Sequence, residues 1–318
     1  MRKIGILTRD CAGVNAAIRS IVRTASFFDL EVVGVHRGYS GLIDGDFIKL
    51  DRSSVSGIIN DGGTILKTSR CKRFREEAFQ KKAVDNIKKE GIDGLIVVGG
   101  NGSLTGAHVL ADRFKVPVVG IPATIDNDIS GVDLSIGADT AVNVAIDALD
   151  KIRDTATSLE RIFIVEVMGR NCGYIALEVA LAAGCEDVIV PEMKDFDYNL
   201  MSNRIIKGSK LGKLSWIVIV AEGAGKAEEV ADLIKEKTGL ETRIAVLGHI
   251  QRGGRPTFKD RNLAARLGNY AVKLLKQGSS DVCVCYNDYV LTSIPLSKAI
   301  ESKDIDYKSY YELIKVLT

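Results

Sequence analysis

Short runs of apolar residues, rich in Val and Ile, recur along this chain, and most are followed by a glycine-bearing turn and an amphipathic segment. Runs that are apolar at successive positions predict strands buried on both faces, which is typical of a parallel sheet covered by helices on each side. Strands are expected at residues 3–8, 30–36, 94–100, 116–122, 161–168, 187–191, 216–223, 243–248 and 282–286. Helices are expected at residues 14–27, 76–90, 103–113, 139–157, 172–183, 198–210, 226–238 and 258–277. This alternation predicts a doubly wound α/β fold, in which ligands bind beyond the carboxyl ends of the strands.

The length of 318 residues suits two domains, each able to bury its own core. A polar, glycine-bearing loop at residues 131–139 precedes a long helical pattern, so a domain boundary is expected near residue 137. The prediction is therefore two Rossmann-like, three-layer domains with mainly parallel sheets.

The charge balance does not favour a nucleic-acid or membrane partner. The net charge is +2, and the arginines stand singly rather than in a basic stripe. The longest apolar runs are too short to span a bilayer, and the first residues, MRKIGILT, lead straight into a strand rather than a signal segment. None of the six cysteines forms a C-x-x-C pair, which favours structural thiols in a reducing compartment. We therefore expect a cytoplasmic protein that acts on small anions.

The segment at 94–107, GLIVVGGNGSLTGA, places two glycines at the end of a strand and predicts a helix start near Ser103, a suitable N-cap. Bare backbone N–H groups at a helix N-terminus attract phosphate, and glycines let the phosphate come close. A tight strand-to-helix turn without a ligand explains the same pattern. Alone, this is a weak signal for a phosphate site.

A sharper pattern follows the next strand, in PATIDNDISG at 122–131. In extended backbone, Thr124, Asp126 and Asp128 would project from one side, so that a hydroxyl and two carboxylates converge. This trio suits a magnesium-phosphate reaction, with one carboxylate as base and the other near the metal. An Asx-rich turn is the alternative interpretation.

Polar side chains also follow other predicted strands. Arg170 lies in VEVMGRNCG, Glu222 ends WIVIVAEG, and His249 and Arg252 lie in GHIQRGGRP. A lone His or Arg in such a loop is usually structural. Several polar strand exits in one doubly wound chain, however, favour a shared site at the carboxyl ends of the strands.

These segments, with NAAIRSIVR, TSRCKRFR and DRNLAARLG, occur in an order and at spacings that resemble bacterial-type ATP-dependent 6-phosphofructokinases from end to end. The resemblance implies the phosphofructokinase fold, with a donor domain at 1–137 plus 251–301 and a sugar-phosphate domain at 138–250 plus 302–318. It also implies an allosteric kinase of glycolysis that forms a homotetramer.

The resemblance further implies the role of each site residue. Asp126 would take the proton from the 1-hydroxyl of fructose 6-phosphate, while Thr124 and Arg170 would steady the transferred phosphoryl group. Asp128 and Asn101 would hold Mg²⁺ beside the ATP co-substrate. The residues that would bind the sugar phosphate are Met168, Gly169, Glu222, His249 and Arg252, joined by Arg161 and Arg243 from a neighbouring subunit. The residues that would bind the nucleotide are Arg9, Arg70, Cys71, Gly100, Asn101, Gly102 and Ser103. The residues that would bind an effector, a nucleotide diphosphate or phosphoenolpyruvate, are Arg19, Arg23, Arg52, Arg153, Glu186 and Lys213.

The donor side departs from the family pattern. The first strand of the family leads into a T-S-G-G-D-x-x-G loop, whereas this chain reads Thr8-Arg9-Asp10-Cys11-Ala12-Gly13, two residues shorter and without the paired glycines. Asn101 replaces an aspartate of the G-G-D-G motif, which predicts a weaker metal site because hard cations prefer charged oxygen ligands. Lys67 and Ala123 stand where glycines are common. Gly102 argues against the pyrophosphate-using branch.

Two functions are consistent with this pattern. One is an ATP-dependent 6-phosphofructokinase with an altered donor loop. The other is a catalytically weakened or inactive regulatory paralogue that binds sugar phosphate and effector, assembled with an active subunit. A nicotinamide dehydrogenase is not indicated, because no G-x-G-x-x-G follows the first strand.

Overall fold

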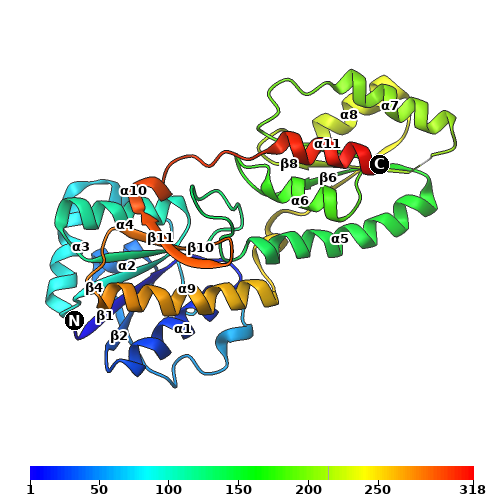
Figure 1. Cartoon of the computed structure of the whole chain (residues 1–318). Coiled ribbons are helices and arrows are strands. Elements are labelled where there is room, and N and C mark those ends of the chain that lie inside the picture. The colour runs from blue at the N-terminus through cyan, green and yellow to red at the C-terminus, as the bar shows by residue number, and fades with distance from the viewer. Residues whose placement is uncertain (214) are drawn as a thin grey trace. The chain divides into compact units, whose positions relative to one another are not determined.

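The computed structural model describes residues 1–213 and 215–318, which divide into two compact units (Figure 1). Unit 1 comprises Met1–Thr140 and Arg252–Lys303, and unit 2 comprises Ala141–Gln251 and Asp304–Thr318. The chain therefore passes from one unit to the other three times. The bounds expected from the sequence, at 137, 251 and 301, fall close to these crossings.

Unit 1 is built on a seven-stranded sheet with the order β11-β10-β5-β4-β1-β2-β3. Its strands are β1 (Lys3–Thr8), β2 (Glu31–Val35), β3 (Phe47–Leu50), β4 (Gly94–Gly99), β5 (Val118–Pro122), β10 (Val282–Asn287) and β11 (Val290–Pro295). The five inner strands are parallel, whereas β3 and β11 pair antiparallel with their neighbours at the two edges. Every residue of β4 and β5 is buried, as expected for the centre of a sheet covered on both faces.

Helices cover both faces of this sheet (Figure 1). The helices of unit 1 are α1 (Val14–Phe27), α2 (Tyr39–Asp44), α3 (Glu77–Glu90), α4 (Asn101–Phe114), α9 (Phe258–Lys276) and α10 (Leu296–Ala299). Helices α1 and α9 pack against each other on one face. Helices α2, α3, α4 and α10 share a hydrophobic core with the other face. Two short 3-10 turns, η1 (Ile58–Asn60) and η2 (Lys72–Arg75), lie in the loops.

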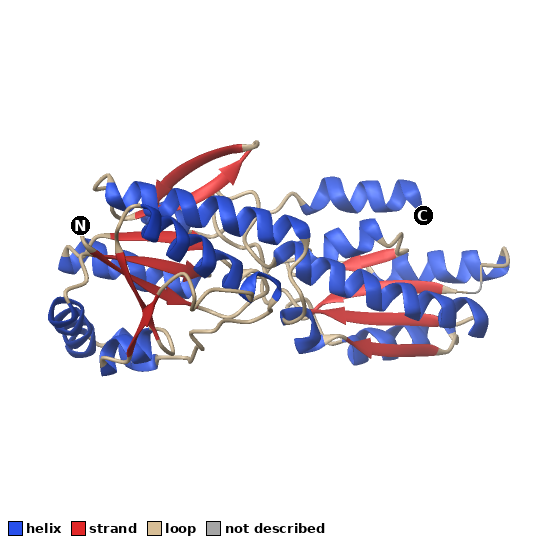
Figure 2. Ribbon diagram, turned by 90° about the horizontal axis from the view of Figure 1, so that it is seen from below, coloured by secondary structure: helices blue, strands red, loops and turns tan. Residues whose placement is uncertain are grey.

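Unit 2 contains a four-stranded, all-parallel sheet with the order β7-β8-β6-β9. The strands are β6 (Ile162–Val167), β7 (Asp187–Ile189), β8 (Trp216–Ala221) and β9 (Thr242–Val246). The helices are α5 (Ala138–Leu159), which begins in unit 1, α6 (Tyr174–Ala182), α7 (Tyr198–Lys210), α8 (Ala227–Thr238) and α11 (Tyr307–Leu317). Apolar residues of α7 and α8 form one core with β6 and β8, and α6 packs with α11. Figure 2 shows helices, in blue, on both sides of the red strands. The 3-10 turn η3 (Gly248–Arg252) follows β9.

The predicted α/β fold with mainly parallel sheets is confirmed, and all nine predicted strands and eight predicted helices are present. Five further elements were not predicted: β3 and β11, which are partly exposed edge strands without a continuous apolar run, and the helices α2, α10 and α11. One predicted boundary is wrong. Helix α4 begins at Asn101, with Gly100 as its N-cap in extended backbone, so Ser103 lies inside the first turn and is buried.

The six cysteines are all free thiols, and five of them are buried. Within the described part of the chain, none of the helices combines the length and the apolar character that a membrane span requires.

Candidate active site

The exits of three neighbouring strands, β1, β4 and β5, form the candidate site of unit 1. Because these strands are parallel and adjacent, their carboxyl ends meet at one edge of the sheet. The contact is close: a Cβ atom added to Gly100, after β4, would lie 3.2 Å from Cβ of Thr124, after β5. The structure therefore brings the glycine segment and the Thr124 segment together within this unit.

The turn that follows β5 buries the candidate base. Asp126 is only 3% exposed, and its backbone N–H donates to Oγ1 of Thr124 over 3.2 Å. Asn127 adopts a left-handed conformation with φ of 49°, and its side chain bonds the backbone of Asp133 and Ser135. The expectation of an extended segment with three side chains on one side is therefore wrong. The backbone turns here, because the Asn127 amide satisfies the polar groups of the returning loop.

Asn101 and Asp128 form a pair at the N-terminus of α4. The Asn101 amide nitrogen donates to Oδ2 of Asp128 over 2.8 Å and to its backbone oxygen over 3.2 Å. The remaining side-chain oxygen of each residue is buried and has no hydrogen-bond partner among the described residues. Buried oxygens without partners are costly, so one on each member of a hydrogen-bonded pair indicates a place for a cation.

The pair fits Mg²⁺ in type and in number. Carboxylate and amide oxygens are hard ligands, and Mg²⁺ is usually held by one or two protein oxygens together with substrate phosphates and water. No group of three or more His, Cys, Asp or Glu residues that could hold a metal ion by itself occurs in the described residues. The candidate metal site is therefore one that needs oxygens from a bound phosphate.

Arg9 lies across the exits of β1 and β4. Its backbone N–H donates to the oxygen of Val98, and its aliphatic part covers Gly99, where an added Cβ would lie 2.9 Å from Cγ of Arg9. Its guanidinium donates to Oγ1 of Thr68 over 3.1 Å and to the backbone oxygen of Ser69 over 2.8 Å. The shortened loop thus places the Arg9 guanidinium beside the N-terminus of α4, next to the segment with Arg70 and Cys71 that is predicted to contact nucleotide.

Tyr39 was missed by the sequence analysis, although it lies among the predicted nucleotide residues. Its hydroxyl donates to the backbone oxygen of Ser103 over 2.7 Å, and its ring fills the space that a Cβ on Gly106 would occupy. The ring also stacks on Phe74, with centroids 4.2 Å apart. Burial raises the pKa of the Tyr39 hydroxyl, so it stays a neutral donor. The signal that could have indicated it is an aromatic residue between two glycines after β2.

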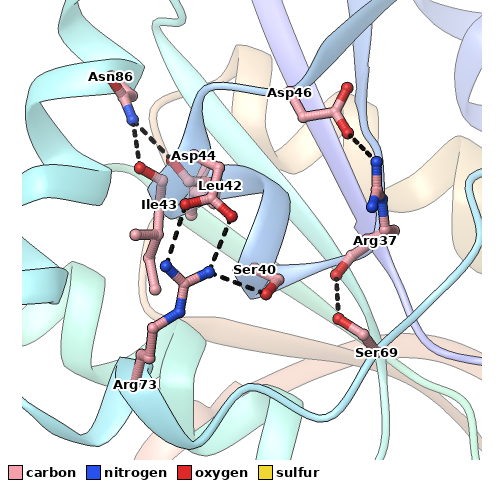
Figure 3. A network of polar contacts seen from close by, with 9 residues as sticks. All are labelled: Arg37, Ser40, Leu42, Ile43, Asp44, Asp46, Ser69, Arg73 and Asn86. Carbon is pink, nitrogen blue, oxygen red and sulfur yellow. Dashed lines mark hydrogen bonds and ion pairs between the residues drawn. The ribbon is translucent and has the colours of Figure 1, made fainter.

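A polar network joins the Tyr39 helix to the segment that carries Arg70 and Cys71 (Figure 3). Arg73 forms a two-pronged ion pair with Asp44, at 2.8 and 3.1 Å, and donates to Ser40. This contact lowers the pKa of the Asp44 carboxyl. Arg70 is exposed and Cys71 is half-buried, so both lie at the surface of a segment that the network holds in place.

The exits of β6, β8 and β9 form the candidate site of unit 2. The backbone N–H groups of Gly169 and Arg170 both donate to Oε1 of Glu222, over 3.2 and 2.8 Å. The N–H of Met168 donates to Oε1 of Gln251 over 2.9 Å. The structure therefore brings the loop at 168–170 and Glu222 together. Gln251 was not predicted.

The loop after β6 is closely packed and partly left-handed. Gly169 has φ of 144° and Arg170 has φ of 52°. A Cβ added to Gly223 would lie 1.7 Å from the backbone oxygen of Arg170, so only glycine fits there. Further along, Glu192 accepts from the N–H of Gly173 over 2.9 Å. Glu192, like Tyr39 and Gln251, was not predicted from the sequence.

The two arginines predicted to act in a neighbouring subunit do not join this loop. Arg161 directly precedes β6 and Arg243 is the second residue of β9, so both lie toward the amino ends of these strands. Both pair with Glu241, at 3.1 and 3.3 Å. His249 lies in η3 and is exposed, whereas Arg252 belongs to unit 1 and donates to the backbone oxygen of Asp10 over 3.3 Å.

The predicted effector residues form two groups. Arg19 and Arg23 lie one turn apart on α1, where burial and then the charge of Arg23 lower the pKa of Arg19. In unit 2, Glu186 pairs with Lys213 over 3.1 Å, and Arg153 donates to the backbone oxygen of Gly184 over 3.0 Å. Arg52, after β3, is exposed.

Comparisons with known proteins agree on one family. A model of the phosphofructokinase family matches residues 3–275. The chain is 51% identical to the ATP-dependent 6-phosphofructokinase of Thermotoga petrophila and 48% identical to that of Bacillus subtilis, over 100% of both sequences in each case. It superposes on the structure of phosphofructokinase from Saccharomyces cerevisiae with a TM-score of 0.88 and 33% identity, covering 94% of this chain and 45% of the yeast chain. A pyrophosphate-dependent phosphofructokinase from Marinobacter aquaeolei shares the fold, with a TM-score of 0.84 and 21% identity over 99% of this chain and 91% of that chain.

Proposed function

Because this chain belongs to the phosphofructokinase family, we propose that it is an ATP-dependent 6-phosphofructokinase, which transfers the γ-phosphoryl group of ATP to the 1-hydroxyl of fructose 6-phosphate in glycolysis. The observation that carries the proposal is the cluster after β4 and β5. There, the Asp126 carboxylate, which is buried, and the Thr124 hydroxyl follow β5. The pair of Asn101, after β4, and Asp128 offers two oxygens suited to a cation. Phosphoryl transfer requires a base, groups that stabilise the charge of the transferred phosphoryl group, and a site for a metal ion.

Asp126 is the general base in this proposal. It accepts the proton of the 1-hydroxyl as that oxygen attacks the γ-phosphorus, and the bond to the leaving ADP oxygen breaks. The Thr124 hydroxyl and the Arg170 guanidinium stabilise the charge on the transferred group, which spreads over its oxygens. The Asp126 N–H bond to Thr124 holds base and hydroxyl in a fixed relation, so the two side chains are positioned together.

Asn101 and Asp128 would hold Mg²⁺ through their two unpartnered oxygens. When bound, the ion neutralises charge on the donor phosphates. The protein contributes a single carboxylate here, so the donor phosphates must supply the remaining charged ligands.

The donor side combines helix amides with an arginine. No side chain among the described residues caps α4, which leaves the amides of Gly100, Asn101 and Gly102 for phosphate. The N–H of Ser103 donates to the backbone oxygen of Gly100 over 2.9 Å, so Ser103 would contact the nucleotide through its hydroxyl. We infer that Arg9 replaces the missing glycine amides with a guanidinium, which can bind phosphate through two N–H groups. Arg70 and Cys71 would contact the nucleotide.

The acceptor side is the loop after β6 with Glu222, His249 and Arg252. Arg161 and Arg243 would bind the sugar phosphate of a neighbouring subunit in a homotetramer. In support, β9 is an edge strand whose Ile244 and Val246 are 42% and 54% exposed, an apolar surface that a second copy would cover. An analysis of oligomer composition would distinguish this homotetramer from an assembly with a different, related subunit.

An effector anion, a nucleotide diphosphate or phosphoenolpyruvate, would bind to Arg19, Arg23, Arg52, Arg153, Glu186 and Lys213. The like-charged pair on α1 supports this part of the proposal, because two guanidiniums one turn apart repel each other until an anion binds. The protein would act in the cytoplasm, where glycolysis takes place.

A coupled assay on the purified full-length chain tests the proposed function. With ATP, Mg²⁺ and fructose 6-phosphate, turnover on the order of 10 per second is expected, the middle of the enzymatic range. A rate at background, with fructose 6-phosphate still bound in calorimetry, would instead identify a binding paralogue without catalysis. Replacing ATP by pyrophosphate should abolish turnover.

A further inference from the structure

We propose that Gln251 is a positioning residue for the loop at 168–170, and that it sets the affinity for the sugar-phosphate acceptor through the backbone of that loop. The inference rests on the proposed function, because it assumes that this loop binds fructose 6-phosphate. Gln251 ends the first segment of unit 2, in the turn after β9, and it is 1% exposed. Its Oε1 atom accepts the N–H of Met168 over 2.9 Å.

The hydrogen bond completes a set that fixes three successive backbone amides. Glu222, from the exit of β8, accepts from the N–H groups of Gly169 and Arg170, and Gln251, from the exit of β9, accepts from Met168. Strand β6 lies between β8 and β9 in the sheet. The loop that leaves β6 is therefore held from both neighbouring strands, by two hydrogen bonds to Glu222 and one to Gln251.

The loop needs such support because its conformation is unfavourable for its sequence. Arg170 is in the left-handed region, with φ of 52°, which a residue with a Cβ atom adopts only when its surroundings compel it. At Gly169, with φ of 144°, an added Cβ would lie 2.5 Å from the backbone oxygen of Cys172. Without the three bonded amides, the chain after β6 would relax toward an ordinary conformation and carry the Arg170 side chain elsewhere.

Folding stability alone does not explain this glutamine. Its Nε2 atom is buried and has no hydrogen-bond partner among the described residues. Leaving a buried N–H group unpaired costs at least as much as a single neutral hydrogen bond contributes, so the two effects roughly cancel. What the side chain provides is a fixed direction for the Met168 amide, and hence for the two residues that follow it.

A substitution that keeps the size of the side chain but removes its acceptor oxygen isolates this role. Gln251→Met is expected to weaken fructose 6-phosphate binding about 10-fold in calorimetry and to raise its KM by the same factor, because small displacements of a positioning loop have effects of this size or larger. The KM for ATP should change less than about 2-fold. Hydrogen exchange of the peptide that contains Met168 should become faster, because its amide loses its acceptor.

Gln80→Met is the matched control. Gln80 is 5% exposed in unit 1, donates one hydrogen bond to the backbone oxygen of Phe74 over 2.9 Å, and has a buried oxygen without a partner in the described part of the chain. Like Gln251, it is a buried glutamine with one hydrogen bond to the backbone and one unpartnered side-chain atom among the described residues, with donor and acceptor exchanged, and its bond is to Phe74 of unit 1 instead of the acceptor loop. This variant should leave fructose 6-phosphate binding unchanged.

These measurements distinguish a failure of the positioning role of Gln251 from a failure of the proposed function. Wild-type binding of fructose 6-phosphate by Gln251→Met would overturn the positioning role, and so would an equal loss of binding in Gln80→Met. A wild-type protein that binds no fructose 6-phosphate would overturn the proposed function itself. If Gln251→Met does not fold, Gln251→Asn provides the test, because its oxygen is one methylene too short for Met168 and the same selective loss of acceptor binding is expected.

Discussion

The side-chain amide of Asn101 donates a 2.8 Å hydrogen bond to the carboxylate of Asp128, and each of the two side chains keeps a buried oxygen without a partner among the described residues. The amide thus holds the carboxylate in place in the absence of a cation, a task that a second carboxylate could not perform. Because Asn101 replaces the aspartate of the family pattern, the pair carries a single negative charge. Asn101 therefore orients the Asp128 carboxylate but attracts a cation less strongly than an aspartate would.

Asn101→Asp should therefore strengthen metal binding and weaken the metal-free fold. The Mg²⁺ concentration for half-maximal activity is expected to fall about 10-fold, because a charged ligand replaces a neutral one. The metal-free protein should melt at a lower temperature, because two adjacent carboxylates repel each other. Activity titrations with Mg²⁺ and melting curves with and without chelator measure the two effects. An unchanged Mg²⁺ requirement would contradict the assignment of this pair as the metal site.

Asp126→Asn should remove the base and leave substrate binding intact. A loss in kcat of about 10²- to 10⁴-fold is expected, the usual contribution of a general base, while the KM for either substrate changes only a few-fold. Asparagine has the shape of aspartate, so the turn around Asn127 should persist. Steady-state kinetics with each substrate varied provide the measurement. A variant that retains more than about a tenth of wild-type kcat would exclude Asp126 as the base.

Arg9→Ala tests whether the Arg9 guanidinium binds the donor phosphates in place of the glycine amides of the family loop. The KM for ATP is expected to rise about 10- to 100-fold, the effect of losing a charge-assisted contact, while the KM for fructose 6-phosphate stays the same. Arg37→Ala is the control, since Arg37 is an exposed cation that pairs with Asp46 and follows β2, the strand next to β1. If the two variants behave alike, Arg9 has no specific part in donor binding.

Replacing Arg9 by Ser-Gly-Gly together with Asn101→Asp should raise activity.

The core of the fold was predictable because its strands are apolar on both faces. Runs such as GLIVVG, the sequence of β4, carry a signal that no amphipathic helix produces. The edge strand β3, FIKL, has no such signal, because two of its four residues are exposed and its partner lies on one side only. Helix α2 was missed for a related reason: at six residues between two glycines, it shows too few turns for a period to be recognised.

The candidate site was predictable where function requires particular side chains, and unpredictable where one side chain supports another. Asp126 and Glu222 could be identified from residue type and position after a strand. Gln251 and Tyr39 act on backbone atoms far away in the sequence, on Met168 and Ser103, and nothing in the residues around them indicates those partners. The turn at Asn127 was misjudged because alternation assumes extended backbone, which a left-handed residue interrupts.

The thiol of Cys185 should make the fold less stable in alkali. Burial raises the pKa of Cys185 to about 12, whereas an unfolded thiol ionises near 8.5. Between these values the folded state binds more protons than the unfolded state, so the free energy of unfolding falls as pH rises, by up to ~1.4 kcal/mol per pH unit. In urea denaturation between pH 9 and 11, Cys185→Ala should show a smaller fall than wild type, by about 2 kcal/mol. Parallel pH dependences would contradict this prediction.

Subunit exchange tests whether Arg243 completes the site of a neighbour. Arg243→Ala and Asp126→Asn should each be nearly inactive as pure proteins. If Arg243 serves the partner's site, mixed oligomers contain sites with an intact Asp126 from one chain and an intact Arg243 from the other. Random pairing after dissociation and reassembly should restore such sites to about a quarter of the total, with wild-type KM. If Arg243 instead acts within its own chain, every site in the mixture lacks one of the two residues, and the activity of the mixture equals the mean of the two pure variants.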